Sequence, residues 1–538
     1  DRVIVMFGRN EYPCRWLKEQ FGEEATEDDC GCALLDSPYR PVIRRTSSGP
    51  PKKGLEPLAE GERFAYYPSR NMAEGKEPGM DAYYEAKIAG MQPGRVVLLT
   101  HAKWAFDRLF VRDYSPSLTV IDEVHGLADN VRNALEVSIS RKRLDHAVQV
   151  LEETGVDKRA AKSLESLSRT LKSVIARKRH EELLDETDIT RIIKPLVSID
   201  IDDLETRIIA AAEANRLDLS QIRTLAHLPM KVSNILKNLQ FALGKYEGRG
   251  SARRVIWHPR KYVFAFHSKE DEEGSKIIIK THTVGSLLAK LAFKEGPTLG
   301  MSATIGDNEI LEWECGLTGK FLSAPPTFPV ENCRLYALKD GPDFSYPNGT
   351  RAAGHIAGRT ARLIKSLQTR ALLLGVSEQE SQAFQRALTR EGIKFVCKKG
   401  NEHFRHASKR FKEGEGQVLV GVMAAYGEGL DLPEGLSPLI ILTRPPHQPP
   451  TDPQSQFEAR RYGKEKAWRL WYWRAGRKVE QARGRNIRSE TDRGVFICAD
   501  RRFGEKLSRY PMAPWIKKMV NIADWSEVEQ ETVRFLKA

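Results

Sequence analysis

Long apolar runs are missing from the 538-residue chain, and no stretch is long enough to cross a bilayer. A signal-peptide pattern is also missing, since the chain opens on Asp1 without an initiator Met. Cysteine is scarce, with seven in the chain, which excludes a disulfide scaffold and favours a reducing, cytoplasmic setting. We therefore expect a soluble protein without a membrane partner, and a start at Asp1 that lies inside a longer gene product.

Repeats at the periods of solenoid proteins are absent, so one stacked array is not expected. The length predicts two or more domains, and 41% hydrophobic residues supply material for their cores. The net charge is +13, from 85 basic and 72 acidic residues. This excess favours a polyanionic partner, of which nucleic acid is the commonest, although an indifferent basic surface explains it equally well.

Short continuous apolar runs predict parallel strands that are covered on both faces, at residues 3–7, 96–100 and 118–121. Residues 14–93 are rich in Pro, Gly and charge and predict a loop-rich insertion. From Ala371 onward, strands alternate with helical stretches, which predicts a second parallel α/β domain. The strands of that domain are expected at residues 371–376, 394–397, 418–422, 439–442 and 494–498.

A helical period takes over from Asn130 to about Tyr246. Apolar residues then recur three and four apart, as in Leu164, Leu167 and Leu171. These stripes are most simply the core of a small helical domain. Strand patterns return at residues 255–257, 262–266 and 276–280, and the last two predict a hairpin.

Adjacent carboxylates, Asp122 and Glu123, follow the third apolar run in the segment IDEVH. The carboxyl end of a parallel strand is where such a sheet binds its ligand. There an Asp can hold Mg²⁺ through water, and a neighbouring Glu can polarise an attacking water. A solvated turn at a strand end is the alternative reading of these five residues taken alone.

Three further segments are weak when taken singly. Ser302 and Thr304 follow a strand in GMSAT, and Gly427, Glu428, Gly429 and Asp431 form a glycine-flanked loop that suits close backbone approach to a ligand. Gln481, Arg485 and Arg488 lie in QARGRNIR, which predicts one helix face carrying two guanidiniums, a pattern that suits a triphosphate. A tight loop and a basic surface helix are the corresponding bland readings.

The order of these four segments resembles the motif series of superfamily 2 helicases: a DEAH-type box, SAT, the motif V loop and QxxGRxxR. Three more segments resemble the XPD/DinG family within it. They are residues 8–14 (GRNEYPC), residues 97–102 (VLLTHA) and residues 440–453 (IILTRPPHQPPTDP). This resemblance extends over nearly the whole chain.

The resemblance implies an α/β fold with two RecA-like parallel-sheet domains. The first would comprise residues 1–13, 94–129 and 251–330, and the second residues 331–538. An iron–sulfur-type insertion would occupy residues 14–93 and a helical Arch domain residues 130–250.

The resemblance also implies an ATP-dependent 5′–3′ helicase, with ATP and Mg²⁺ bound between its two RecA-like domains. The partners it implies are single-stranded DNA, a DNA duplex or an RNA–DNA hybrid, and a monomer is expected. Catalytic roles fall to Asp122, Glu123, Gln481, Arg485 and Arg488. Nucleotide contacts fall to His125, Ser302, Thr304, Gly427, Glu428, Gly429 and Asp431.

Two departures from the family pattern stand out. The chain has no G-x-x-x-x-G-K-[ST] loop to cradle phosphates, and we expect that loop upstream of Asp1. Family members with a [4Fe–4S] cluster use four cysteines in the insertion, whereas only Cys14, Cys30 and Cys32 occur here. We therefore expect a vestigial insertion without the cluster. A three-cysteine cluster with a substitute ligand is the alternative.

Proteins usually bind single-stranded DNA with basic side chains that contact the backbone and aromatic side chains that stack on the bases. Trp104, Arg469 and Trp473 are the candidates, and packing of Trp468, Trp471 and Tyr472 in the core is the competing interpretation.

With its degraded cluster site, the chain resembles the DinG-type helicases of type IV CRISPR systems, which implies an RNA-guided complex as a partner. A housekeeping DinG/XPD-type repair helicase and a catalytically dead, nucleic-acid-binding homologue are the alternatives.

Overall fold

The computed structural model describes residues 3–7, 11–15, 18–19, 42–45, 64–67, 81–111, 115–244, 260–267, 274–345, 347–427, 432, 435–487 and 489–537. The chain forms two compact units, each made of several segments. Unit 1 consists of Asp1–Met301, Glu312–Thr318 and Thr451–Arg461. Unit 2 consists of Ser302–Leu311, Gly319–Pro450 and Tyr462–Ala538.

Unit 1 contains two pairs of parallel strands, and three of the four strands lie at the predicted apolar runs. The expectation that both faces of these strands are covered is wrong for the described residues, because Val3, Val5, Val96, Leu98 and Val120 are about half exposed. Strand β1 (Val3–Met6) pairs with β4 (Val96–Leu99), and β5 (Thr119–Ile121) pairs with β10 (Thr298–Gly300). A two-stranded antiparallel pair, β2 (Val42–Arg45) and β3 (Phe64–Tyr67), lies within residues 14–93, the stretch predicted to be a loop-rich insertion. The helices near these strands are α3 (Ala82–Gly90), α4 (His101–Phe106), η3 (Asp107–Val111), η4 (Val124–Gly126), α5 (Leu127–Ala134), α12 (Gly285–Leu291) and η5 (Phe293–Glu295). Helix α13 (Asn308–Cys315) includes a point where the chain passes from unit 2 to unit 1.

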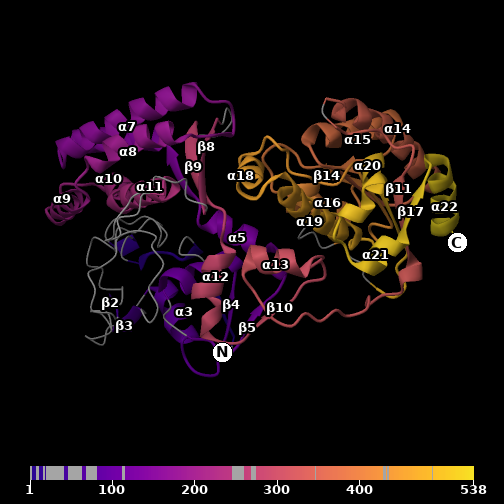
Figure 1. The fold of residues 1–538 in the computed structure, drawn as a ribbon, viewed down its shortest axis with the longest axis horizontal. Helices are drawn as coiled ribbons and strands as arrows, with labels where there is room; N and C mark the ends of the chain where they lie inside the picture. Colours follow the sequence, from indigo (N-terminus) through magenta and orange to yellow (C-terminus); the bar gives the residue numbers. More distant parts are fainter. Residues whose placement is uncertain are drawn as a thin grey trace. The chain divides into compact units, whose positions relative to one another are not determined.

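The predicted helical block is present in unit 1 (Figure 1). Its helices are α6 (Arg141–Thr154), α7 (Lys158–Ala176), α8 (Glu186–Val197), α9 (Ile201–Glu213), α10 (Leu219–Leu225) and α11 (Leu228–Ala242). Leu164, Leu167 and Leu171 are buried in one apolar core, as their spacing predicted. Asp157, Asp185 and Asp200 accept backbone N–H bonds at the starts of α7, α8 and α9, which explains where these helices begin.

A four-stranded antiparallel sheet packs with these helices in the order β6 (Val137–Ser140), β9 (Lys276–Thr281), β8 (Lys261–Phe266) and β7 (Glu182–Leu183). The predicted hairpin is therefore present, and it forms part of the same sheet as β6 and β7. Its strands hydrogen-bond to β6 and β7 of the helical block, and Val263 and Ile279 are buried in the core of that block.

Helix α18 (Pro453–Tyr462) covers the opposite face of this sheet. Its Phe457 is buried against Tyr262, with ring centroids 5.2 Å apart. Beside it, Glu458 accepts a hydrogen bond from Nε2 of the buried His282 at 2.8 Å. The segment Thr451–Arg461 therefore belongs to unit 1, although unit 2 segments flank it in the sequence.

Unit 2 is built on a seven-stranded parallel sheet in the order β13-β14-β12-β15-β16-β11-β17. The strands are β11 (Cys333–Leu338), β12 (Ala371–Gly375), β13 (Phe395–Val396), β14 (Val418–Val422), β15 (Leu439–Leu442), β16 (Gly494–Cys498) and β17 (Val520–Ala523). Five of these strands match the runs predicted from the sequence.

Helices cover both faces of this sheet (Figure 1). One face carries α14 (Gly349–Leu367), α15 (Glu378–Arg390) and α22 (Trp525–Lys537). The other carries α16 (Phe404–Lys412), α17 (Met423–Tyr426), α19 (Lys464–Arg483), α20 (Arg501–Glu505) and α21 (Pro514–Met519), and short turns occur at η6 (Val330–Asn332) and η7 (Leu507–Arg509). Successive strand residues point into opposite cores, as Leu372 and Leu373 do. Both faces are therefore apolar, and the strands read as continuous hydrophobic runs.

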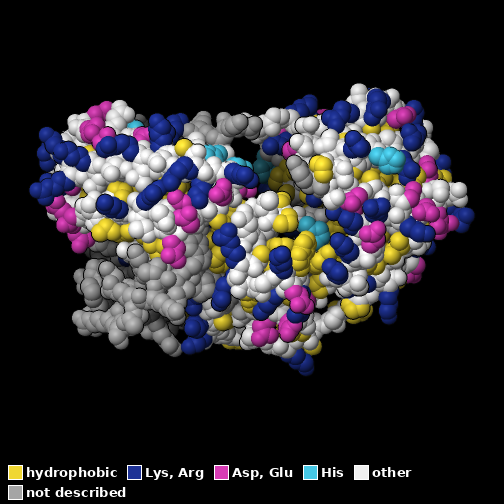
Figure 2. All heavy atoms as spheres, turned by 45° about the horizontal axis from the view of Figure 1, so that its top comes forward, with side chains coloured by type: hydrophobic (Ala, Val, Ile, Leu, Met, Phe, Trp, Pro, Cys, Tyr) yellow, Lys and Arg dark blue, Asp and Glu magenta, His cyan; other side chains and the backbone are white. Residues whose placement is uncertain are grey.

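In the part of the chain that the structure describes, no helix is long and apolar enough to cross a membrane. Basic side chains are spread among acidic ones over the face shown in Figure 2 and do not gather into one stripe.

Candidate functional site

The two carboxylates of the IDEVH segment lie at the carboxyl end of β5, where the sequence predicted them. The chain turns sharply there because Glu123 adopts a left-handed conformation with φ of 46°. The neighbouring strand holds this turn on both sides. Met301 N–H donates to the Ile121 carbonyl at 2.8 Å, and Val124 N–H donates to the Met301 carbonyl at 2.9 Å. Ile121 is buried, whereas Asp122 and Glu123 are exposed at the strand end.

Asp122 is fixed by a short chain of hydrogen bonds. Its Oδ1 accepts from Glu123 N–H at 2.9 Å, and its backbone carbonyl lies 2.8 Å from Nε2 of His101. Because a carbonyl only accepts, Nε2 carries the proton, and Nδ1 then accepts from the Asn130 amide at 3.0 Å. Both ring nitrogens of His101 are thus engaged in hydrogen bonds.

Glu123 and the residues after it are also packed tightly. Nδ1 of the buried His125 lies 3.2 Å from Oε2 of Glu123. A Cβ added at Gly300 would lie 3.1 Å from Cγ2 of Val124 and 2.9 Å from a methyl of Leu317. Glycine at position 300 therefore lets β10 approach the turn without displacing Val124 or Leu317.

The arrangement suits a hard cation that keeps most of its water. Among the residues that the structure describes, no group of three or more His, Cys, Asp or Glu side chains converges on one point. A protein cage for a metal is therefore not present there. An exposed Asp122 carboxylate at a strand end fits Mg²⁺, which is usually held by one or two carboxylates together with water and phosphate oxygens.

The SAT segment forms a tight turn in unit 2. Ser302 Oγ accepts from Thr304 N–H at 3.0 Å, and Thr304 is buried. The serine hydroxyl therefore shapes the backbone directly after the strand, a local role that the sequence reading did not assign.

The arginine segment differs from its prediction. Helix α19 ends at Arg483, and Gln481 lies on it, but Arg485 lies in the turn that follows and not on a helix face. Gly484 is a poor helix former, and the chain turns there toward β16. Nη2 of Arg485 lies 3.5 Å from the Gly427 carbonyl, so the structure does bring Arg485 to the motif V loop. Arg488, Glu428, Gly429 and Asp431 lie outside the described residues.

Asn486 is a residue that the sequence reading missed. It is 4% exposed, and its amide donates to the carbonyls of Ser437 at 2.9 Å and Val495 at 3.2 Å. A Cβ at Gly494 would lie only 2.4 Å from the Asn486 side chain. Asn486 thus connects the turn at Arg485 to β16 by hydrogen bonds. In the sequence, the only indication of this contact was an Asn that lies between Arg485 and Arg488.

The three nucleic-acid candidates are not presented for stacking on a base. Trp104 is buried and packs against Phe293. Trp473 is 1% exposed, its indole N–H donates to the Ile305 carbonyl at 2.8 Å, and the Arg477 guanidinium lies 3.8 Å from its ring centre. Arg469 is half-exposed and pairs with Asp307 at 2.7 Å.

The competing interpretation, packing in the core, holds for Trp471 and Tyr472, which are both buried. Trp468 is 41% exposed, so part of its indole reaches solvent. Cys14 is buried, while Cys30 and Cys32 lie outside the described residues.

Residues 360–519 match the helicase C-terminal domain family. Over 256 residues the chain is 27% identical to a probable ATP-dependent helicase of Methanocaldococcus jannaschii, a match that covers 44% of this chain and 39% of that protein. The chain therefore spans about two fifths of the length of the curated relative it matches.

Two solved structures are similar in fold. An XPD helicase is 16% identical with a TM-score of 0.57, over 97% of this chain and 86% of that one. XPD in its apo form is 18% identical with a TM-score of 0.52, over 80% of this chain and 81% of that one. This likeness confirms the predicted α/β fold with parallel sheets of the RecA-like kind.

Proposed function

We propose that the chain is the motor of an ATP-dependent helicase that moves 5′ to 3′ along single-stranded DNA. The observation that carries the proposal is the Asp122–Glu123 turn. Two exposed carboxylates project from a turn at the carboxyl edge of a parallel strand pair. The backbone of this turn is held by His101 and Met301, and His125 lies beside the Glu123 carboxylate. The helicase C-terminal domain match over residues 360–519 supports it from a separate part of the chain.

In this proposal each side chain has a defined task. Glu123 orients a water for in-line attack and takes up its proton, and Asp122 accepts hydrogen bonds from the cation's water shell. Mg²⁺, when bound with ATP, neutralises phosphate charge. Arg485, together with Arg488, supplies guanidinium donors to phosphate oxygens as charge spreads over them. The Ser302 hydroxyl holds the backbone that follows β10 by accepting from Thr304 N–H.

The test is Glu123→Gln in the full-length protein, which keeps size and hydrogen bonding but removes the base. We expect DNA-stimulated ATP hydrolysis to fall at least roughly a hundredfold, the scale of a lost general base. Glu152→Gln, the same change at an exposed position of α6, is the matched control and is expected to leave the rate unchanged. Hydrolysis by the Glu123 variant at the wild-type rate contradicts the assignment.

The finer parts of the proposal need separate measurements. A duplex with a 5′ single-stranded tail should be unwound and one with a 3′ tail should not, and a matching RNA–DNA hybrid tests the second substrate. Equal unwinding of both tails contradicts the polarity.

We also propose an RNA-guided complex of the type IV CRISPR kind as the partner, on the basis of the three-cysteine insertion with Cys14, Cys30 and Cys32. Co-purification with that complex, together with the absence of iron from the purified protein, is the expected result. An iron-loaded protein favours a repair helicase instead.

A further inference from the structure

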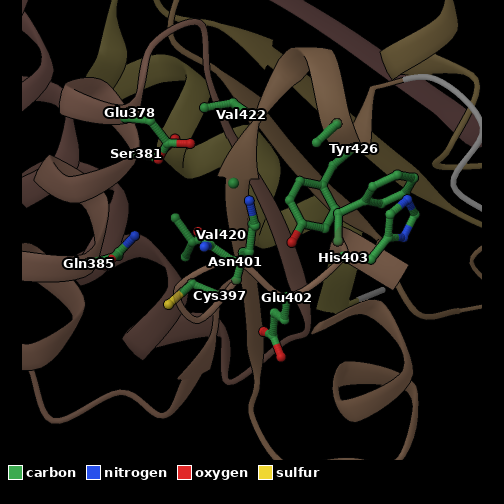
Figure 3. Close-up of a pocket in the computed structure, with 14 residues that line it drawn as sticks. Glu378, Ser381, Gln385, Cys397, Asn401, Glu402, His403, Val420, Val422 and Tyr426 are labelled. Carbon is green, nitrogen blue, oxygen red and sulfur yellow. The ribbon is translucent and has the colours of Figure 1, made fainter. Parts of the chain in front are cut away.

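Unit 2 contains a cavity of about 310 Å³ that the proposed function does not use (Figure 3). It lies at the carboxyl ends of β13 and β14 and beside the first turns of α15 and α16. Strand ends of parallel sheets are the usual place for a ligand, and this volume lies within the range of small-molecule sites.

One wall of the cavity is aromatic. The Tyr426 ring lies directly over Gly421, where an added Cβ would come within 2.1 Å of ring atom Cε2. Glycine at position 421 is therefore needed for the ring to lie there. Phe404 meets Tyr426 edge to face with centroids 5.8 Å apart, and the His403 ring lies 4.4 Å from that of Phe404. Tyr426 is buried and backs this wall, whereas Phe404 is half-buried and His403 is exposed, so these two rings give a flat ligand surfaces to pack against.

Two buried hydroxyls on the cavity lining have no hydrogen-bond partner, Tyr426 Oη and Ser381 Oγ. Each residue is only 1% exposed. A buried polar group left unpaired is costly, so two of them on one cavity need an explanation. Gln385 and Asn401 add amide donors and acceptors, and in Figure 3 the Tyr426 hydroxyl points toward the side where these amides lie.

The charges on the lining argue against a phosphate. The lining includes two carboxylates, Glu378 and Glu402, and one ammonium, Lys398. Glu402 is paired with Arg410 at 2.5 Å, so the guanidinium of Arg410 is already engaged. A neutral planar ring with donors and acceptors along its edge matches aromatic walls and unpaired hydroxyls better than an anion does.

We infer that this cavity receives one nucleobase of the single strand bound by unit 2. The inference rests on the proposed function, because it takes the base from the strand on which the motor moves. Base–aromatic stacking tolerates any sequence, which suits a protein that must move along a strand without reading it. The same ring chemistry occurs in a free nucleotide, and the experiment distinguishes the two sources.

The central variant is Tyr426→Phe in the full chain, which removes only the hydroxyl. Binding of an oligothymidylate and of an abasic strand of equal length is compared by fluorescence anisotropy. We expect the affinity for oligothymidylate to fall about threefold to tenfold, the range for one lost hydrogen bond, and that for the abasic strand to stay unchanged. The melting temperature should not fall, because the hydroxyl has no partner within the protein.

Tyr336→Phe is the matched control, since Tyr336 is a buried tyrosine of β11 outside the cavity, and it should change neither affinity. A second variant, Ala425→Phe, fills the cavity from its lining and should also weaken oligothymidylate selectively. Ultraviolet cross-linking of a strand containing 5-iodouracil should modify the peptides that carry Phe404 or Tyr426.

Three outcomes overturn the inference. Equal loss on both strands, or no loss on either, shows that no base enters the cavity. Weaker binding of a fluorescent ATP analogue by Tyr426→Phe, with oligothymidylate unaffected, assigns the cavity to a free nucleotide. A wild-type chain that binds neither strand overturns the proposed function itself, and the inference falls with it.

Discussion

His101 connects two parts of the IDEVH turn that are distant in sequence. Its Nε2–H holds the Asp122 carbonyl, and its Nδ1 accepts from Asn130 on α5. The ring touches the backbone of the candidate site and not its carboxylates. We therefore regard His101 as a positioning residue.

A substitution at this position should lower turnover without weakening ATP binding. For His101→Ala we expect kcat for ATP hydrolysis to fall roughly tenfold, the scale of lost outer-shell support, with KM unchanged. His101→Gln should restore most of the rate, because the Gln amide can donate to the same carbonyl. A loss of kcat that Gln does not rescue, or an increase in KM alone, contradicts the positioning role.

Glu480 is a buried acid next to Gln481 on α19. It is 3% exposed, and Ala513 N–H donates to its Oε1 at 2.7 Å. Burial raises the pKa of Glu480 to about 7, although Arg483 and Arg477 act in the opposite direction. The folded state therefore retains a proton that the unfolded state, with a pKa of 4.5, has lost.

The contribution of Glu480 to stability follows from this difference. It is complete below pH 4.5, declines as pH rises and is lost above about 7. Glu480→Gln should remove that decline and raise the unfolding free energy of unit 2 at pH 8 by on the order of 3 kcal/mol. Denaturant titrations at pH 5 and pH 8 measure it. Glu465→Gln, at an exposed position of the same helix, is the control, and identical pH profiles for the two variants would falsify the argument.

At the scale of elements, helix α18 is the clearest case of packing that overrides sequence position. It follows β15 of unit 2 in the chain, yet Phe457 completes the apolar face that Leu183, Tyr262, Phe264 and Ile278 present. The buried hydrogen bond between His282 and Glu458 lies beside this contact. The β8–β9 hairpin is thus covered by a segment from far along the chain.

Removing the Phe457 ring should destabilise unit 1 and leave the stability of unit 2 unchanged. We expect Phe457→Ala to cost about 3–5 kcal/mol, the usual range for a large buried aromatic. Hydrogen exchange should speed up in β8 and β9 and stay unchanged in β14 and β15. Arg460→Ala, on the exposed side of α18, should alter neither region. Faster exchange confined to unit 2 would contradict the placement of α18.

At the scale of the whole molecule, the parallel sheets were the most predictable part. Continuous apolar runs such as residues 371–375 and 439–442 are buried on both faces, so the pattern alone identifies them. The site at the end of β5 was also predicted from an apolar run followed by two carboxylates, although one face of that run is exposed, with Val120 at 51%.

Contacts between distant segments could not be predicted in this way. Nothing local in Phe457 or Glu458 points to Tyr262 and His282, and the hairpin strands gave no sign of pairing with β6 and β7. The burial of Trp473 could not be predicted either, because α19 buries residues around most of its circumference and its sequence shows no single apolar face. The turn at Arg485 depends on Asn486, whose partners in β16 and before β15 are invisible in the sequence.

The threading of α18 has a practical consequence for dividing this protein. A cut between Met301 and Ser302 looks like a natural boundary between the units. It would, however, separate Phe457 from the residues it packs against, Leu183, Tyr262, Phe264 and Ile278. Each fragment would then carry an exposed hydrophobic patch, and aggregation is the expected fate of such surfaces. A separately expressed unit 1 would instead need residues 312–318 and 451–461 joined to its C-terminal end. The folding of unit 1 therefore depends on segments that lie next to unit 2 in the sequence, although each unit has its own core.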